Sequence, residues 1–312
     1  MRNIKATPKT AIKKVEYPLF DLDNARRLFD NLDVSEVTRA DYKARIKHFL
    51  DFVSFRGIYQ NTLLEYKTEL TNRITSTGAL SISTKNKYLA TARAYLKISA
   101  RLFNLPDYSK DVKGFTQNKK HKKEGINRPE MDQLINIIKA LPADTKGKRA
   151  RALFTLLTFQ GLRQIEIRRL RVTDIDLRNE IAFITGKGSD DRELIYLHKE
   201  TVKALRDYIA AIGSPDGYLF QSLGNRKSAG MFSIMTLQRE IKGLFELCNI
   251  SKTVHGFRHF YITQLLEKFD VRTVRKFSRH SNLEMLIVYD DETDTRRKSG
   301  EIFQTLSEIV NF

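Results

Sequence analysis

The chain has 312 residues, a length that predicts about two domains. Lys and Arg number 55 against 37 Asp and Glu, and the resulting formal charge of +18 favours a polyanionic partner, above all nucleic acid. No apolar run reaches the roughly 18 residues of a membrane span, and the single cysteine, Cys248, excludes a disulfide within the chain. With no signal-peptide pattern at the start, we expect a cytoplasmic protein with no membrane partner.

The first part of the chain predicts a basic arm followed by a helical domain. Residues 1–15 hold five basic residues, no acidic residue and no apolar periodicity, so we expect a flexible arm. From 16 to 116 the apolar spacing is helical throughout, with Thr38 and Thr84 as expected helix caps and Gly78 as an interruption. This range predicts a small all-helical domain with basic side chains that can follow a phosphate backbone.

A polar segment separates this domain from the rest of the chain. Residues 117–126 include the basic run QNKKHKKEG, which does not favour packing and predicts an interdomain linker. Asn127 and Glu130 then show capping-box spacing, and we expect the helix that they open to begin a second domain, 127–312.

The second domain predicts helices around one stretch of a different period. Between Val172 and Leu197 three apolar groups follow strand spacing, separated by turn-forming residues, which indicates a three-stranded antiparallel sheet. Lys187 lies between two glycines at an expected hairpin tip, where a long cation can reach a ligand. The predicted fold class is therefore mainly α with a small antiparallel sheet (α+β).

Two positions before this sheet form a candidate ion pair. Arg163 and Glu166 lie three residues apart on one face of a helical pattern that follows Gly161. Such a pair on a surface contributes little to stability. The surrounding motifs give this pair a larger expected role.

The stretch from 254 to 290 gathers residues that bind or attack a phosphate. If 254–266 is helical, His255, Arg258 and His259 cluster beside an apolar face and point away from the core. The spacing of the two histidines also fits zinc ligation, but no carboxylate completes an H-E-x-x-H pattern. We therefore expect no metal site, with a zinc protein as an alternative.

His280 and Tyr289 extend this candidate site. They are nine residues apart, or about two and a half helical turns, so one unbroken helix would point them in opposite directions. A break at Ser281 and Asn282, both residues that cap helices, would let them share a site.

Four motifs, in order, resemble those of the tyrosine recombinases, the phage-integrase and Xer type of site-specific recombinase. They are Gly161-Leu162-Arg163-Gln164-Ile165-Glu166, Gly186-Lys187-Gly188, His255-Gly256-Phe257-Arg258-His259, and Arg279-His280-Ser281 followed by Tyr289. The resemblance covers about 127–289, and the helical domain is similar to the family's core-binding domain in pattern only. The family usually has Gly where this chain has Arg279, and we expect a local backbone adjustment there.

The resemblance implies a recombinase that cuts and rejoins DNA through a 3′-phosphotyrosyl intermediate, for integration or resolution. No metal, ATP or other cofactor is expected, because the covalent link retains the bond energy. The implied roles are phosphate binding by Arg163 and Arg258, nucleophilic attack by Tyr289, proton acceptance by His255, proton donation by Lys187, hydrogen bonding by His280 and support by Glu166.

The expected partners are double-stranded DNA with a specific recombination site and three further copies of the chain. An apolar stripe within 299–312 predicts a C-terminal exchange helix that docks on its own domain or, as the resemblance favours, on a neighbour in a homotetramer. Two other functions stay open at this point. One is DNA breakage and rejoining of the type IB topoisomerase kind, and the other is a non-catalytic DNA-binding protein.

Overall fold

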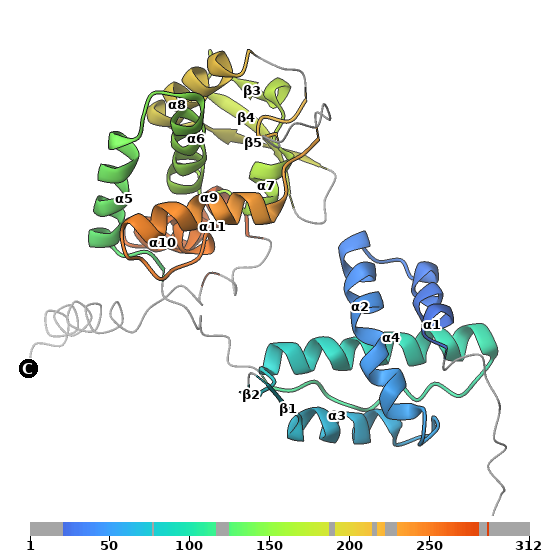
Figure 1. The fold of residues 1–312 in the computed structure, drawn as a ribbon. Helices are drawn as coiled ribbons and strands as arrows, with labels where there is room; N and C mark the ends of the chain where they lie inside the picture. The colour runs from blue at the N-terminus through green and yellow to red at the C-terminus, as the bar shows by residue number, and fades with distance from the viewer. Residues whose placement is uncertain are drawn as a thin grey trace, which may run out of the picture. The chain divides into compact units, whose positions relative to one another are not determined.

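The computed structural model describes residues 21–76, 78–116, 125–186, 191–213, 217–221, 230–280 and 286. The chain divides into two compact units, an N-terminal unit of 1–118 and a C-terminal unit of 119–312 (Figure 1). None of the helices within the described ranges is long and apolar enough to cross a membrane. The predicted arm at 1–15, nearly all of the predicted linker at 117–126 and the predicted exchange helix at 299–312 lie outside these ranges.

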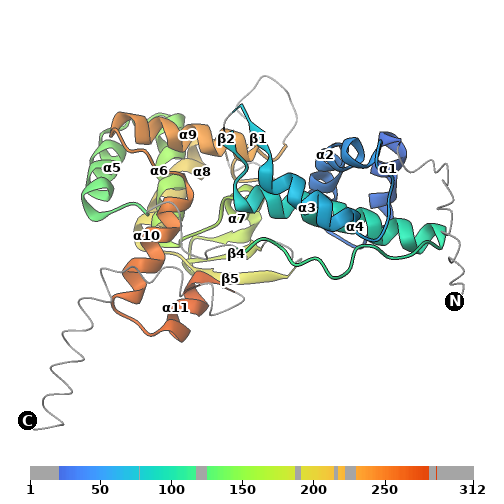
Figure 2. The same ribbon diagram turned by 90° about the horizontal axis from the view of Figure 1, so that it is seen from below.

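The N-terminal unit is built mainly from helices. Its elements are α1 (Leu22–Leu28), η2 (Phe29–Asn31), α2 (Glu36–Val53), α3 (Thr62–Asn72), β1 (Ile74–Thr75), β2 (Gly78–Ala79) and α4 (Ile82–Phe103). Helix α4 packs against α1, α2 and α3, as Figures 1 and 2 show. Their shared core contains the aromatic side chains of Phe29, Phe49, Tyr66 and Tyr95.

Two details of this unit differ from the sequence prediction. The caps of α2 and α4 are Ser35 and Ser81, whose hydroxyls accept from the backbone N–H of Thr38 and Thr84 at 3.3 and 3.2 Å. Serine and threonine three residues apart both suit a cap, and the earlier hydroxyl takes the position in each case. The unit is also not all-helical, because β1 and β2 form a short antiparallel hairpin at Gly78.

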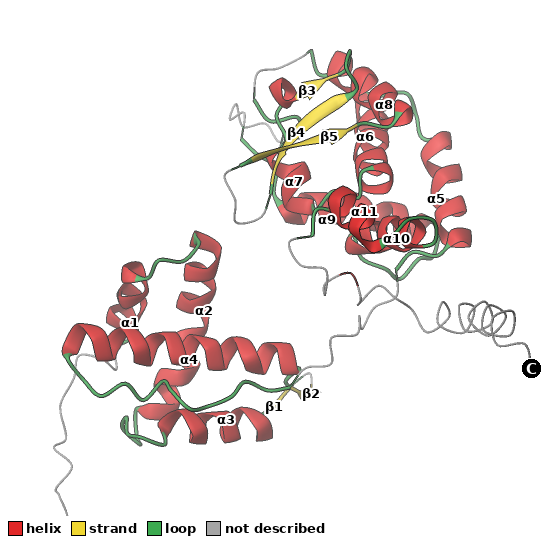
Figure 3. Cartoon of the chain, turned by 180° about the vertical axis from the view of Figure 1, so that it is seen from behind, coloured by secondary structure: helices red, strands yellow, loops and turns green. Residues whose placement is uncertain are grey.

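The C-terminal unit surrounds one small sheet with helices. Its helices are α5 (Arg128–Ala140), α6 (Thr145–Phe159), α7 (Gln164–Arg169), η3 (Val172–Asp174), α8 (Lys199–Ala211), α9 (Ile234–Leu247), α10 (His255–Leu266) and α11 (Val271–Ser278). Helix α5 begins at the predicted capping box of Asn127 and Glu130. The predicted antiparallel sheet is present as β3 (Ile175–Asp176), β4 (Ile181–Thr185) and β5 (Arg192–Tyr196) (Figure 3).

The register of the sheet buries one of its faces. Thr185 pairs with Arg192 at the end of the β4–β5 hairpin, and side chains alternate along β4, so that Ala182 and Ile184 are buried while Phe183 is exposed. Val172, which we placed in the first strand, lies instead in the η3 turn. The fold class of a mainly helical protein with a small antiparallel sheet is confirmed.

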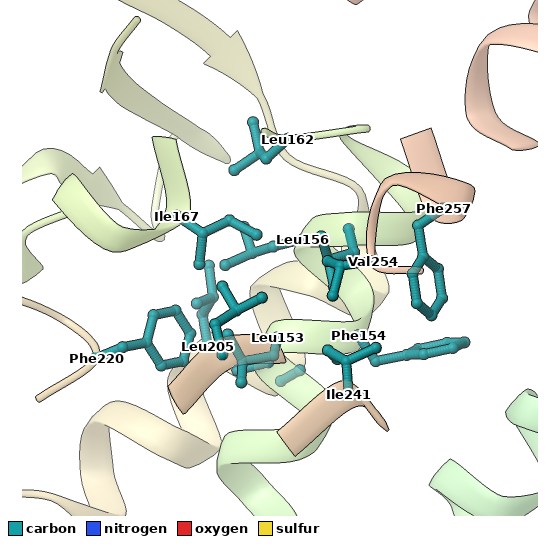
Figure 4. Packing of buried hydrophobic residues seen from close by; sticks show 14 of the residues in the cluster. Leu153, Phe154, Leu156, Leu162, Ile167, Leu205, Phe220, Ile241, Val254 and Phe257 are labelled. Carbon is teal, nitrogen blue, oxygen red and sulfur yellow. The ribbon is translucent and has the colours of Figure 1, made fainter. Parts of the chain in front are cut away.

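Helix α6 lies at the centre of the core of the C-terminal unit. Figure 4 shows its residues Leu153, Phe154 and Leu156 among side chains from α7, α8, α9 and α10. Phe154 meets Phe257 of α10 edge to face, with ring centroids 5.6 Å apart. This packing holds the C-terminal end of α6 and the N-terminal half of α10 against each other, and the candidate site forms where they meet.

Candidate active site

The turn after α6 positions the first site residues. Gly161 has a φ of +54°, in the left-handed region, and a Cβ there would lie 2.3 Å from the Tyr261 ring. Only glycine satisfies both the backbone conformation and the close approach of the ring. The turn places Arg163 directly before α7, with its backbone extended at a φ of −73° and a ψ of 149°.

Arg163 and Glu166 form the predicted ion pair, and it is mostly buried. Oε2 of Glu166 accepts from the backbone N–H of Arg163 at 2.8 Å, and Oε1 accepts from Nη1 at 2.7 Å. The Glu166 side chain is 1% exposed and that of Arg163 is 27% exposed. Burial alone raises the pKa of the Glu166 carboxyl, but the charge of Arg279 and the hydrogen bonds from Arg163 outweigh it and hold the pKa below its ordinary value.

Arg258 lies inside the protein, contrary to our expectation for the polar face of its helix. The residue is 2% exposed, and its Nη1 donates to the backbone oxygen of Gly161 at 2.7 Å while Nη2 donates to that of Ser278. His259 is also buried, and of the three polar residues only His255 is exposed. The expectation was wrong because the carbonyls that satisfy the Arg258 guanidinium come from segments far away in the sequence.

His280 lies against Arg258 at the end of α11. Its Nε2 is 3.4 Å from Nη2 of Arg258, its Nδ1 is 2.8 Å from the Ser278 hydroxyl, and its backbone oxygen accepts from Nε of Arg275 at 3.1 Å. Burial lowers the pKa of His280 to about 3, helped by the nearby charges of Arg258, Arg163, Arg279 and His255. The imidazole is therefore neutral at physiological pH before any anion enters the site.

Arg279 belongs to this cluster, although its place in the sequence did not predict a role for it. Its backbone is left-handed, with φ 55° and ψ 47°, the region that favours glycine. Our expectation of a local backbone adjustment at this position stays a prediction. Its Nη2 lies 3.3 Å from Oε2 of Glu166, and its backbone oxygen accepts from Nη2 of Arg163 at 2.9 Å. The sequence held one signal for a role of this side chain, because Arg279 is a large residue at a position where the family usually has Gly.

Of the other predicted site residues, the structure describes only His255. His255 is the first residue of α10. Lys187 lies outside the described residues, but the backbone oxygen of Gly186 accepts from Nη1 of Arg169 on α7 at 2.8 Å. Tyr289 and the expected break at 281–282 also lie outside.

Leu286, three residues before Tyr289, is 1% exposed and packs with Ile262 of α10 and Val274 of α11. At Leu286 the chain therefore packs on the α10–α11 pair.

The described residues offer no site for zinc, the metal of the alternative function. No three His, Cys, Asp or Glu side chains there are grouped so that they could hold a metal ion. The Nδ1 of His259 is 3.3 Å from the Thr263 hydroxyl, and the close approach of Gly125 to the same ring leaves no room for a Cβ.

Known proteins are similar to the C-terminal unit and to much of the rest of the chain. The sequence profile described as the phage integrase family matches residues 126–296. A tyrosine recombinase of Pseudothermotoga lettingae is 29% identical over 280 residues, covering 86% of this chain and 90% of that protein. A tyrosine recombinase of Synechococcus elongatus is 30% identical over 257 residues, covering 80% of this chain and 77% of that protein.

Solved structures share the fold at lower identity. The XerH site-specific recombinase bound to its palindromic difH substrate, in a post-cleavage complex, aligns with a TM-score of 0.69 at 18% identity, covering 91% of this chain and 85% of that one. A lambda integrase dimer bound to a COC′ core site aligns with a TM-score of 0.65 at 12% identity, covering 87% and 76%.

Proposed function

This chain belongs to the phage integrase family of tyrosine recombinases, and from that premise we propose that it cuts and rejoins DNA through Tyr289. It is a site-specific recombinase, an enzyme of DNA strand breakage and rejoining, and the relatives support this over a topoisomerase.

The observation that carries the proposal is that four predicted residues form two pairs in direct contact, which Arg279 links. Arg163 and Glu166 form one pair, Arg258 and His280 form another, and the backbone oxygen of Arg279 accepts from Arg163. These residues come from three parts of the sequence and meet at the ends of α6, α7, α10 and α11. A cluster of guanidiniums beside a neutral imidazole suits the two non-bridging oxygens of a DNA phosphate.

In the proposed reaction the Tyr289 oxygen attacks the phosphorus and displaces the 5′ oxygen. The phosphorus–O5′ bond breaks as the tyrosyl–phosphorus bond forms, which leaves a 3′-phosphotyrosyl link and a 5′-hydroxyl. His255 accepts the tyrosine proton, and Lys187 donates a proton to the departing oxygen. Attack by a 5′-hydroxyl from another strand reverses the steps and rejoins the DNA.

Arg163 and Arg258 hold the phosphate in this reaction, and His280 hydrogen-bonds it. The negative charge of an incoming phosphate raises the lowered pKa of His280, which favours the protonated ring that donates this hydrogen bond. Glu166 keeps Arg163 in place through two hydrogen bonds.

We propose double-stranded DNA with a specific recombination site as the partner and a homotetramer as the active assembly. Structural neighbours bound to DNA sites support the DNA partner, and the charge of +18 supplies the cations that phosphates require. The N-terminal unit adds a second surface for the duplex, and the segment at 299–312 docks on a neighbouring protomer.

A nicked suicide duplex tests the assignment of the nucleophile. Wild-type protein should become covalently attached to the duplex, whereas Tyr289→Phe should bind it without forming an adduct, because only the hydroxyl is lost. Tyr196→Phe is the matched control, since Tyr196 is an exposed tyrosine of the same unit and its variant should react normally. An adduct that persists in Tyr289→Phe would overturn the assignment.

A further inference from the structure

Arg279 joins segments that lie more than a hundred residues apart in the sequence. We propose that it is a positioning residue for strand cleavage, whose side chain and backbone oxygen together fix the Arg163–Glu166 pair relative to His280. This inference rests on the proposed function, because it assigns Arg279 an effect on the same site.

The side chain of Arg279 makes the first half of the connection. Its Nη2 lies 3.2 Å from the Gln160 oxygen, 3.4 Å from the Gly161 oxygen and 3.3 Å from Oε2 of Glu166. The side chain is 5% exposed, so these contacts form away from bulk water. One guanidinium thus holds both the end of α6 and the first turn of α7.

The backbone of Arg279 makes the second half. Its oxygen accepts from Nη2 of Arg163 at 2.9 Å, while Arg163 and Arg279 both contact the Glu166 carboxylate. The three residues therefore form a closed ring of hydrogen bonds. His280 follows Arg279 directly, so a shift of this ring moves the imidazole relative to Arg163.

The Gly161 oxygen connects this ring to the second arginine of the site. It accepts from Nη1 of Arg258 at 2.7 Å and lies 3.4 Å from Nη2 of Arg279. Arg163, Arg258 and His280 are thus joined through Arg279 and one carbonyl, before a phosphate is present.

The backbone conformation separates a positioning role from a purely structural one. The left-handed backbone is unfavourable for a residue other than glycine, so glycine would serve the turn better if only the chain path mattered. Arg279→Gly therefore supplies the preferred backbone and removes the guanidinium alone.

The test measures the rate of covalent adduct formation on a nicked duplex with three variants of the full chain. Arg279→Gly removes the fork and the charge, whereas Arg279→Lys keeps the charge but cannot contact two carbonyls and Glu166 in the same geometry. Both should cleave about 10- to 100-fold more slowly than wild type, as expected for displaced reacting groups. Arg272→Ala is the control. It removes an exposed charge from α11, the helix that ends at Arg279, and should cleave at the wild-type rate.

The pKa of His280, followed by NMR titration of its imidazole in the free protein, gives a second readout, which reports the surroundings of the ring and does not depend on the stability of the fold. The charges that face this ring come from Arg258 and His255 on α10, Arg163 before α7, and Arg279 itself. Arg279→Gly should raise the pKa, and Arg279→Lys should leave it close to the wild-type value.

Wild-type cleavage by both Arg279 variants, or a His280 pKa unchanged in Arg279→Gly, would overturn the inference. If Arg279→Gly does not fold, the cleavage rate of Arg279→Lys decides the question. Failure of the wild-type protein to form an adduct would instead contradict the proposed function, so the two failures are distinguishable.

Discussion

Removing the charge of Glu166 should destabilise the C-terminal unit more than removing an exposed carboxylate. The Glu166 carboxylate accepts from the Arg163 backbone, from Nη1 of Arg163 and from Nη2 of Arg279, at 2.8, 2.7 and 3.3 Å. In glutamine one oxygen still accepts but without a charge, and the amide nitrogen is a donor, so the hydrogen bonds on one side are weakened and those on the other are lost, at about 1 kcal/mol or more each. Arg279 is 5% exposed, so solvent cannot replace its lost partner, whereas Arg163 is 27% exposed and loses less.

We therefore expect Glu166→Gln to lower the free energy of unfolding by about 2–3 kcal/mol. Urea unfolding of the full chain, followed by far-ultraviolet circular dichroism, measures the change. Glu246→Gln is the control, because Glu246 pairs with Lys242 at 3.1 Å with side chains 64% and 75% exposed, and its loss should cost less than about 0.5 kcal/mol.

A double-mutant cycle tests the reason for this effect. If the lost stability comes from the contacts with Arg279, then Glu166→Gln should cost less in an Arg279→Gly background, with a coupling free energy of about 1–3 kcal/mol. A Glu166→Gln variant as stable as Glu246→Gln would refute the argument that the buried guanidinium needs its counter-charge.

Two further predictions concern pH and the turn at Gly161. The pKa of His280 is about 3 in the folded protein against an ordinary 6.5, so protonation of the unfolded chain should reduce the free energy of unfolding as pH falls below 6.5, by about 2 kcal/mol at about pH 5. His280→Gln should remove this part of the pH dependence, measured as the difference in unfolding free energy between about pH 7 and pH 5. An unchanged pH dependence in this variant would contradict the prediction. Gly161→Ala should cost about 1–2 kcal/mol from the left-handed backbone and a further 1–3 kcal/mol from the contact with Tyr261, so a wild-type melting temperature would contradict the described turn.

Local patterns in the sequence were sufficient for much of the fold. The capping box at Asn127, the strand spacing before Leu197 and the pairing of Arg163 with Glu166 each involve residues close together in the chain. Such interactions depend on backbone geometry that a few residues determine, so their spacing predicts them.

The environment of Arg258 could not be predicted in the same way. Its acceptors, the oxygens of Gly161 and Ser278, are backbone atoms that carry no side-chain signature. The helical pattern around Arg258 indicates only that it is polar, and a polar residue is usually exposed. For Arg279, likewise, the left-handed backbone and the contact with Glu166 appear only after α11 is placed against the end of α6.

The use of backbone oxygens in this cluster affects how it responds to mutation. Side-chain replacements at Ser278 remove its hydroxyl but leave the carbonyl that accepts from Arg258, and a replacement at Gln160 likewise leaves the oxygen that accepts from Arg279. An alanine scan of the surrounding residues will therefore miss several of the atoms that hold the guanidiniums. Substitution of a backbone amide by an ester at the following residue, which weakens the carbonyl as an acceptor, would detect them directly.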